Sequence, residues 1–435
     1  MKKFLPLISV LLIAAFVLAA CGTPATTAAP EATKAPEATK APEATKAPEA
    51  TKAPEVTPVK ITVWHQWSGD YLTAIEQIFK DYEAAHPGVT ISLDKPDNVS
   101  DALKVAIPAG EGPDIIGWAQ DQIGSQALVG NIVDLDSLGV DQAFMDSTFE
   151  PAAVKATIWQ GKIWALPESQ EGIALVYNKK LMTDEYLPTD PTDFADLLAK
   201  AKAFAEANPG KYLICNQGLG NIDAFHAAPI WFGFGMNSYV DDMGKAYMNS
   251  PEALKAAEWI KEFSAYAPKE TSHEICKTML VEGQAAAWWT GPWAIADIEA
   301  AGIDYGIIPM GRPFVNVKTL MISVNAVDRG TAATALDILK YFTSADVSKQ
   351  LALINKTVPA NSAALKDPEV AALYTVAQFG ASLNLGVPSS NTPFAMAQWD
   401  PVGSATTAIW NGSQTPQEAC DAAQAAIEAK VAEIQ

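Results

Sequence analysis

The sequence is poor in cysteine, histidine and basic residues, and each shortage excludes a kind of function. Its 435 residues include 4 cysteines and 4 histidines, and 30 lysines and arginines stand against 50 aspartates and glutamates. The formal charge of −20 disfavours nucleic acid and anionic lipid surfaces as partners, because both repel an acidic protein. It suits a neutral small-molecule ligand. Neither Cys-x-x-Cys nor His-x-x-x-His occurs, so we predict no metal site and no cofactor.

Only one long apolar run is present, and it lies at the N-terminus. Lys2 and Lys3 precede an uncharged stretch from Phe4 to Ala19, which suits a signal peptide better than a spanning helix of about 20 apolar residues. It ends in Leu-Ala-Ala-Cys at Cys21, which resembles a bacterial lipobox. We predict removal of residues 1–20 and lipidation of Cys21, which places the mature protein on the outer face of the cytoplasmic membrane. An ordinary signal peptide with an incidental cysteine is the alternative.

Residues 21–58 contain almost nothing that could form a core. The hexapeptide Ala-Pro-Glu-Ala-Thr-Lys repeats from Ala29 through Lys52, and no aromatic or large aliphatic residue occurs between Cys21 and Val56. Such a segment cannot bury enough apolar surface to order itself. Regular proline favours extended conformations, so we predict a disordered, semi-rigid tether behind the lipidated cysteine.

The remaining residues, 59–435, are long enough for two domains. Three cysteines stay available there, which allows at most one disulfide. We favour Cys215–Cys276, because both residues fall in the middle third of the chain, and Cys420 then stays free. Three buried free thiols are the alternative.

Strand and helix periodicities alternate at the start of this part. They predict strands at 60–64, 89–93 and 114–118, a helix that ends at Pro87-Gly88, and a helix over 100–109 capped by Ser100. Such βαβ order implies a mostly parallel sheet, whose ligands bind beyond the carboxyl ends of its strands. Trp67 and Asp70 follow the first strand, and Trp118 and Asp121 follow the third. We therefore expect both pairs at one edge.

Tryptophan is abundant, with 12 residues. Trp293 follows Gly291-Pro292, and Trp399 follows a loop over 388–393, whereas Trp259 and Trp410 lie in helical patterns typical of a core. A pyranose ring has an apolar face and a rim of hydroxyl groups. Its binding site needs flat aromatic side chains beside carboxylates or amides. The loop tryptophans are therefore candidate sugar contacts.

Several blocks of sequence together resemble the maltose/maltodextrin-binding proteins of bacterial ABC importers. In chain order the blocks are Gly112-Pro-Asp-Ile-Ile-Gly-Trp118 with Asp121, Gly161-Lys-Ile-Trp-Ala-Leu-Pro167 with Glu171, Val176-Tyr-Asn-Lys179, Gly291-Pro-Trp293, Tyr305-Gly-Ile307, Pro313-Phe-Val315 and Ser323-Val-Asn-Ala326. Their order and spacing follow the family from Lys60 to the C-terminus.

The resemblance implies an α/β fold of the type II periplasmic-binding-protein class. Two discontinuous lobes are joined by a hinge, and the ligand binds in the cleft between them. The N-terminal lobe would comprise 59–169 and 313–362, and the C-terminal lobe 170–312 and 363–435. Sugar would draw the lobes together by hinge closure, and the permease subunits of the importer would read the closed state of a monomer.

The resemblance also implies roles for individual residues. Trp118, Trp293 and Trp399 correspond to stacking platforms, and Asp121 and Glu171 correspond to carboxylates that accept hydrogen bonds from sugar hydroxyls.

Three further correspondences are looser. Phe225 lies where the family often has a stacking tyrosine, Asp223 lies at a neighbouring carboxylate position, and Asp70 takes the place of a charged pair in the first loop. Asp114 reads as a structural residue at a strand start.

Two departures leave the ligand's identity open. Gln122 and Gly403 stand where enteric maltose binders have arginines, so maltose, trehalose, cyclodextrins and other glucans all stay possible. A polyol, a peptide or a glycerophosphodiester on the same fold is a further alternative, although no basic cluster favours a phosphate. A glycosidase that uses Glu168 and Glu171 is the enzymatic alternative, which we do not favour.

Overall fold

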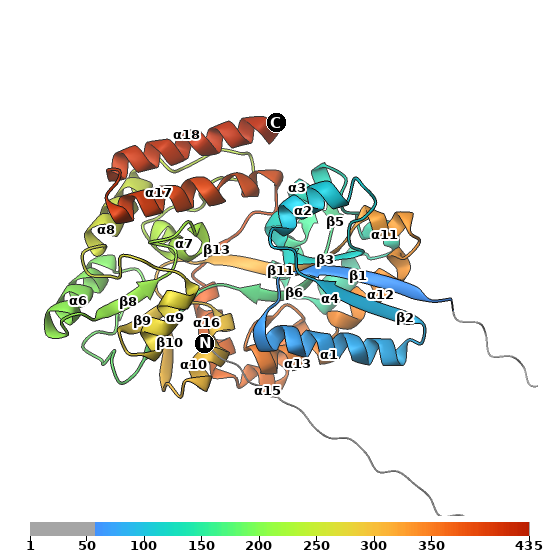
Figure 1. Cartoon of the computed structure of the whole chain (residues 1–435), viewed down its shortest axis with the longest axis horizontal. Helices are drawn as coiled ribbons and strands as arrows, with labels where there is room; N and C mark the ends of the chain where they lie inside the picture. The colour runs from blue at the N-terminus through green and yellow to red at the C-terminus, as the bar shows by residue number, and fades with distance from the viewer. Residues whose placement is uncertain (1–56, 435) are drawn as a thin grey trace, which may run out of the picture. The chain divides into compact units, whose positions relative to one another are not determined.

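Two main β-sheets organise residues 57–434, the part of the chain that the computed structural model describes, apart from the side chain of Asp70 (Figure 1). The predicted signal peptide, Cys21 and nearly all of the tether lie outside these residues. The first sheet has strand order β12-β6-β11-β3-β1-β2, and β13 also pairs with β11. Its strands are β1 (Val59–His65), β2 (Val89–Asp94), β3 (Ile115–Ala119), β6 (Leu166–Glu171), β11 (Phe314–Ile322), β12 (Val358–Pro359) and β13 (Val387–Pro388).

The second sheet has strand order β10-β7-β9-β8. Its strands are β7 (Ala174–Asn178), β8 (Tyr212–Asn216), β9 (Ala285–Thr290) and β10 (Tyr305–Ile308), and a separate hairpin joins β4 (Ile158–Trp159) to β5 (Lys162–Ile163). Each sheet has its own hydrophobic core, one around Ile61, Phe79 and Leu320 and the other around Leu213, Trp231 and Trp289.

The prediction of a mostly parallel sheet is wrong beyond the first three strands. β1 pairs in parallel with β2 and with β3, whereas β11 pairs antiparallel with β3 and with β6, and β6 pairs antiparallel with β12. β11 enters the first sheet directly from the second, without a crossover helix, so nothing fixes it parallel to its neighbours. In the second sheet only β8 and β9 are parallel.

Helices cover the first sheet. α1 buries Ile75, Ile78 and Tyr82 at helical spacing. It ends at Ala85, directly before His86-Pro87-Gly88, and Gly88 has a φ of 96°. The prediction that Ser100 caps the next helix is wrong: the side chain of Asn98 accepts the hydrogen bond from the Asp101 N–H. The α-helices of this lobe are α1 (Gly69–Ala85), α2 (Val99–Ala106), α3 (Ile123–Leu128), α4 (Gln142–Thr148), α5 (Pro151–Ala156), α11 (Val324–Asp328), α12 (Ala332–Phe342) and α13 (Ala345–Asn355), with short 3-10 helices η1 (Gln120–Gln122) and η2 (Asp136–Leu138).

A second group of helices surrounds the second sheet. It contains α6 (Phe194–Ala207), α7 (Ala224–Gly233), α8 (Pro251–Phe263), α9 (His273–Val281), α10 (Ile295–Ala300), α16 (Tyr374–Leu383), α17 (Trp399–Asn411) and α18 (Pro416–Ile434), with 3-10 helices η3 (Pro292–Ala294) and η4 (Pro393–Ala397). Two short helices, α14 (Ser362–Lys366) and α15 (Pro368–Ala371), contact α13 of the first lobe before α16 begins. The long α17 and α18 lie side by side (Figure 1). Trp259 in α8 and Trp410 in α17 are buried, as their helical patterns predict.

The chain passes between the lobes along the central strands. It leaves the first sheet at the end of β6, begins β7 at Ala174, and returns between β10 and β11, where β6 and β11 lie side by side (Figure 1). Nothing in the sequence pattern indicated a further return near residue 387. There β13 pairs with β11, and η4 packs against α3 and η1 of the first lobe before α17 begins. The residues after 363 therefore contact both lobes.

Two long-range links hold these layers in place. Asp114 is buried at the start of β3, where it accepts hydrogen bonds from the Thr62 N–H (2.8 Å) and from Arg329 Nη2 (2.9 Å), so its role is structural. In the second lobe a disulfide joins Cys215 of β8 to Cys276 of α9, the pair favoured from the sequence, and Cys420 is a buried free thiol. Among the described helices, none is both long enough and apolar enough to span a bilayer.

Candidate functional site

A pocket of about 610 Å³ lies between the two lobes. The first lobe contributes the loop before α1, the first turn of α1, Lys318 of β11 and the end of α13. The second lobe contributes α9 and the start of α10. The lining residues are Gln66, Trp67, Ser68, Gly69, Tyr71, His273, Glu274, Lys277, Trp293, Ala296, Asp297, Lys318, Ile354 and Asn355. The pocket thus carries one tryptophan from each lobe, Trp67 and Trp293.

Local structure fixes the indole of Trp67 at the base of this pocket. Its ring stacks on His65 with a centroid separation of 5.0 Å and on Phe342 at 5.5 Å. Its Nε1–H donates to Glu168 Oε2 at 3.3 Å, and the Tyr71 hydroxyl donates to the other oxygen of Glu168. Because Trp67 is only 3% exposed, it offers an edge to the pocket and not a full stacking face.

Lys318 is the cation at the base of the pocket. Its Nζ lies 2.8 Å from Glu171 Oε1 and 5.5 Å from the centroid of the Tyr71 ring. The contact is an ion pair between the ammonium group and the carboxylate. Burial raises the pKa of Glu168, whereas the charge of Lys318 and the hydrogen bond from Tyr71 lower it.

Each lysine that lines the pocket is paired with a carboxylate. Lys277 lies 2.7 Å from Glu274 and 3.5 Å from Asp297, and Lys318 is paired with Glu171. Both lysines of the lining are therefore already neutralised by carboxylates. This arrangement suits a ligand that has no net charge but has many hydrogen-bonding groups.

Trp293 lies in the part of the pocket wall that the second lobe forms, and two neighbouring rings support it. It follows Gly291 at the start of η3, and its ring packs at 5.8 Å against His226 and at 6.3 Å against Phe225. Trp118 does not line this pocket: together with Gln66, Trp67 and Lys318 it borders a separate crevice that is too narrow to admit a water molecule. The structure therefore brings Trp293, but not Trp118, to the wall of the pocket.

Asp121 and Trp399 connect the two lobes directly. The Nε1–H of Trp399, the first residue of α17, donates to Asp121 Oδ2 in η1 at 3.1 Å. Asp121 is 6% exposed, and its burial raises the pKa of the carboxyl to about 7 despite this hydrogen bond. Its other oxygen, Oδ1, has no hydrogen-bond partner within residues 57–434.

Buried polar atoms without a protein partner gather at this junction of the described chain. Besides Asp121 Oδ1 they include atoms of Gln122 in η1, Ser169 in β6, Asn316 in β11 and Ser389 after β13. Buried polar groups in proteins almost always have hydrogen-bond partners. The junction therefore has donor and acceptor capacity that the described residues do not use among themselves.

The remaining predicted residues have structural surroundings. Asp223 caps α7: it accepts hydrogen bonds from the N–H and Nδ1 of His226, at 3.0 and 2.7 Å. Burial opposes its ionisation, but His226 outweighs burial and lowers the pKa of Asp223 to about 2. Phe225 stacks on Phe314 at 6.2 Å and lies behind Trp293. Asp70 is the second residue of α1, and its side chain lies outside the description.

Several lining residues were not predicted from the sequence. They are Tyr71 of α1, Lys318 of β11 and four charged or titratable residues of α9 and α10: His273, Glu274, Lys277 and Asp297. Ser272 caps α9 through a hydrogen bond to the Ile275 N–H, a signal that could have located the helix. No local sequence pattern indicates that this helix faces the other lobe across the pocket.

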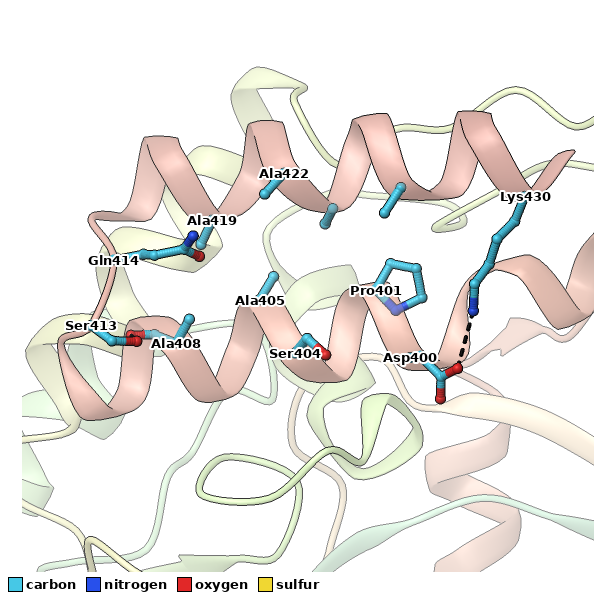
Figure 2. Close-up of a pocket in the computed structure, with 12 residues that line it drawn as sticks. Asp400, Pro401, Ser404, Ala405, Ala408, Ser413, Gln414, Ala419, Ala422 and Lys430 are labelled. Carbon is cyan, nitrogen blue, oxygen red and sulfur yellow. Dashed lines mark hydrogen bonds and ion pairs between the residues drawn. The ribbon is translucent and has the colours of Figure 1, made fainter. Parts of the chain in front are cut away.

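A larger pocket of about 780 Å³ lies elsewhere, between α17 and α18 (Figure 2). Figure 2 shows alanines of both helices facing one another and the Asp400–Lys430 ion pair, 3.0 Å long, at one end. No aromatic side chain lines it. The interlobe pocket is the better candidate site because it combines aromatic rings, paired charges and both lobes.

Comparison with known protein families assigns the chain to one family. The model of the bacterial extracellular solute-binding protein family matches residues 77–378. The chain belongs to this family. As a solute-binding protein it has the two-lobe type II fold that the sequence blocks implied, and its resemblance to maltodextrin-binding proteins is confirmed.

Individual relatives agree with this assignment. The chain is 28% identical to a maltotriose-binding protein of Pyrococcus abyssi, over 80% of this chain and 77% of that one. It is 24% identical to a galactooligosaccharide-binding protein of Bacillus subtilis, over 74% and 77% of the two chains. Its fold matches the maltose/maltodextrin-binding domain from Bdellovibrio bacteriovorus bound to maltotriose, with a TM-score of 0.76, 22% identity and coverage of 86% and 100%.

Proposed function

We propose that this solute-binding protein is the extracytoplasmic receptor of an ABC importer and binds an oligosaccharide of the maltodextrin type. The observation that carries the proposal is the interlobe pocket, which combines the ring of Trp293, the edge of Trp67 and lysines that are paired with carboxylates. Such a lining fits a neutral ring with an apolar face and a hydroxyl rim. The names of its relatives, which include maltotriose- and maltodextrin-binding proteins, support the same class of ligand.

Ligand binding would favour the closed arrangement of the lobes. The Asp121–Trp399 hydrogen bond and the pocket both involve residues of the two lobes. A sugar that contacts both lobes stabilises closure by the difference between its affinities for the closed and open states. We propose that the permease subunits recognise the closed monomer, which the lipid on Cys21 holds at the outer face of the membrane.

A thermal-shift screen against a panel of sugars tests the proposal most directly. The panel should contain maltose, maltotriose, maltohexaose, trehalose, a cyclodextrin and a galactooligosaccharide, with glycerophosphodiesters as a charged comparison. A ligand specific for the folded state raises the melting temperature. We expect the largest shift with an α-glucan. A shift with none of the sugars would contradict the proposal.

Replacement of Trp293 by alanine is expected to weaken oligosaccharide binding by about 2 kcal/mol, or about 30-fold, because the sugar loses an aromatic surface. Isothermal titration calorimetry measures the change. Trp164→Ala is the matched control, since Trp164 is a half-buried tryptophan of the first lobe outside the pocket lining. An unchanged dissociation constant for Trp293→Ala would remove Trp293 from the site.

Carbohydrate hydrolysis is the alternative that the same residues raise. Glu168 is buried, and burial raises its pKa, as in a general acid. However, both of its oxygens accept hydrogen bonds from Trp67 and Tyr71, and Glu171 is ion-paired with Lys318. We therefore propose a receptor without catalysis. Incubation with maltohexaose tests this, because any accumulation of shorter sugars excludes a pure receptor.

A further inference from the structure

We propose that Gly291 is a positioning residue of this binding site: because it has no side chain, the indole of Trp293 lies flat on its backbone, and this sets the ring face that a sugar can meet. The role rests on the proposed function, in which Trp293 stacks on the ligand. It identifies the groups that hold the stacking ring in place.

The space next to Gly291 is filled by the ring of Trp293. A Cβ atom at position 291 would overlap with Cη2, Cζ3 and Cε3 of Trp293, the farthest of them at 2.7 Å, whereas carbon atoms in contact are normally about 3.5–4.0 Å apart. A point about equally near to three consecutive ring atoms lies over the face of the ring and not beyond its edge. One face of the indole therefore rests on Gly291 and is closed to a ligand, so a stacking sugar must lie on the opposite face.

The backbone at Gly291 does not itself require glycine. Its φ of −108° and ψ of −177° are extended values that any residue adopts. Pro292 follows at the start of η3, where its ring fixes φ, and the Gly291 carbonyl accepts a hydrogen bond from the Ala294 N–H at 3.1 Å. The backbone under the indole is thus well fixed, and glycine at this position serves to make room for the ring.

His226 is the second support of the indole. Its imidazole stands at 83° to the indole, with a centroid separation of 5.8 Å. The imidazole is itself held in place, since its Nδ1 lies 2.7 Å from Asp223 Oδ2, and the same oxygen accepts a hydrogen bond from Gln217 Nε2 at 3.2 Å. Asp223, which the sequence blocks placed near the ligand, therefore acts on the site through His226 and Trp293.

Gly291→Ala is the decisive variant. The new methyl group overlaps with the outer atoms of a single side chain, so we expect the ring of Trp293 to move and the backbone to stay in place. The affinity for maltotriose should fall about 10-fold, because the displaced ring no longer stacks on the sugar. Isothermal titration calorimetry measures the change.

A double-mutant cycle with Trp293→Ala separates positioning from a general loss of structure. Once Trp293 is alanine, Gly291→Ala has no ring to displace, and it should change the affinity by less than about 2-fold. The double variant should also be as stable as Trp293→Ala alone, because the overlap is gone. His226→Gln, which keeps a hydrogen-bond donor for Asp223, should lower the affinity about 3-fold when Trp293 is present and leave it unchanged when Trp293 is alanine.

Gly306→Ala is the matched control. Gly306 is a buried glycine of β10 in the same lobe, and a Cβ atom there would overlap with the ring of Tyr177, its partner in β7. Neither residue lines the pocket. The variant therefore introduces the same kind of overlap with an aromatic ring away from the ligand, and we expect its affinity for maltotriose to stay at the wild-type value.

Two results would overturn the role of Gly291. One is wild-type affinity in Gly291→Ala, and the other is an equal loss of affinity with and without the Trp293 ring. If wild-type protein binds none of the sugars, the proposed function is wrong, and fluorine-19 NMR of protein labelled with 5-fluorotryptophan then decides the role of Gly291.

This label places fluorine on Cζ3, one of the atoms that lie over Gly291. The resonance that is absent from Trp293→Phe belongs to Trp293. Displacement of the ring in Gly291→Ala must shift this resonance and increase its response to exchange of H2O for D2O, whereas Gly306→Ala must leave both unchanged. A Trp293 resonance that Gly291→Ala leaves in place overturns the inference.

Discussion

Removal of the disulfide, by replacing Cys215 and Cys276 together with alanine, is expected to lower the free energy of unfolding by about 4 kcal/mol. The two cysteines are 61 residues apart, and in the chain-entropy description a cross-link that closes a loop of this length restricts the unfolded chain by about that amount. Urea denaturation followed by tryptophan fluorescence measures the change. Reduction of the wild-type protein should produce the same loss.

The disulfide also bears on binding, because it holds one wall of the pocket. Cys276 lies in α9, between Glu274 and Lys277 of the lining, and Cys215 anchors this helix to β8. We expect the double variant to bind its sugar more weakly than wild type at temperatures where both are folded. Cys420→Ala is the control, since Cys420 is buried but unbridged. A double variant as stable as wild type would show that α9 is held by its packing alone.

The parts of the fold that the sequence predicts are those governed by local rules. The first three strands and the helix between the first two follow from residue periodicity and from the Pro87-Gly88 stop. Each predicted strand lies within one residue of β1, β2 or β3. The block around Trp293 led to the second lobe's wall of the pocket because Gly291 and Pro292 start the 3-10 turn that carries this ring, whereas Trp118 lies near the end of β3.

The parts that the sequence does not predict depend on contacts between distant segments. The Asp121–Trp399 hydrogen bond joins residues 278 positions apart. Lys318 reads as one polar residue in a strand until its register with Ser169 places it beside two glutamates. Asp223, by contrast, is explained by a local contact. Its carboxylate accepts a hydrogen bond from the His226 N–H at the start of α7, and this capping role competes with any role in ligand binding.

Replacement of Asp121 by asparagine is expected to have opposite effects on stability and on binding. In the folded protein burial raises the pKa of Asp121 from 3.8 to about 7, so between these pH values the folded state holds a proton that the unfolded state has released. Stability then falls as pH rises from about 4 to 7. A difference of about 3 pH units at about 1.4 kcal/mol each sets an upper limit of about 4 kcal/mol.

Asparagine keeps an oxygen for the Trp399 N–H but cannot ionise. The stability of Asp121→Asn relative to wild type should therefore increase from pH 4 to 7 and stay constant above, whereas its affinity for sugar should fall, because the carboxylate with the unpartnered Oδ1 is lost.

Asp223→Asn is the matched control of opposite sign. The pKa of Asp223 is lowered to about 2, so wild type gains stability from Asp223 above pH 3.8 and loses it as pH falls toward 2. Chemical denaturation of the three proteins from pH 2 to 8 covers both pH windows. Parallel profiles for wild type and Asp121→Asn would mean that Asp121 is solvated and ionised throughout. Without ligand, ionisation of this buried interlobe carboxylate destabilises the folded protein. A sugar hydroxyl that donates a hydrogen bond to the carboxylate would offset this cost, and sugar binding would then favour closure of the lobes.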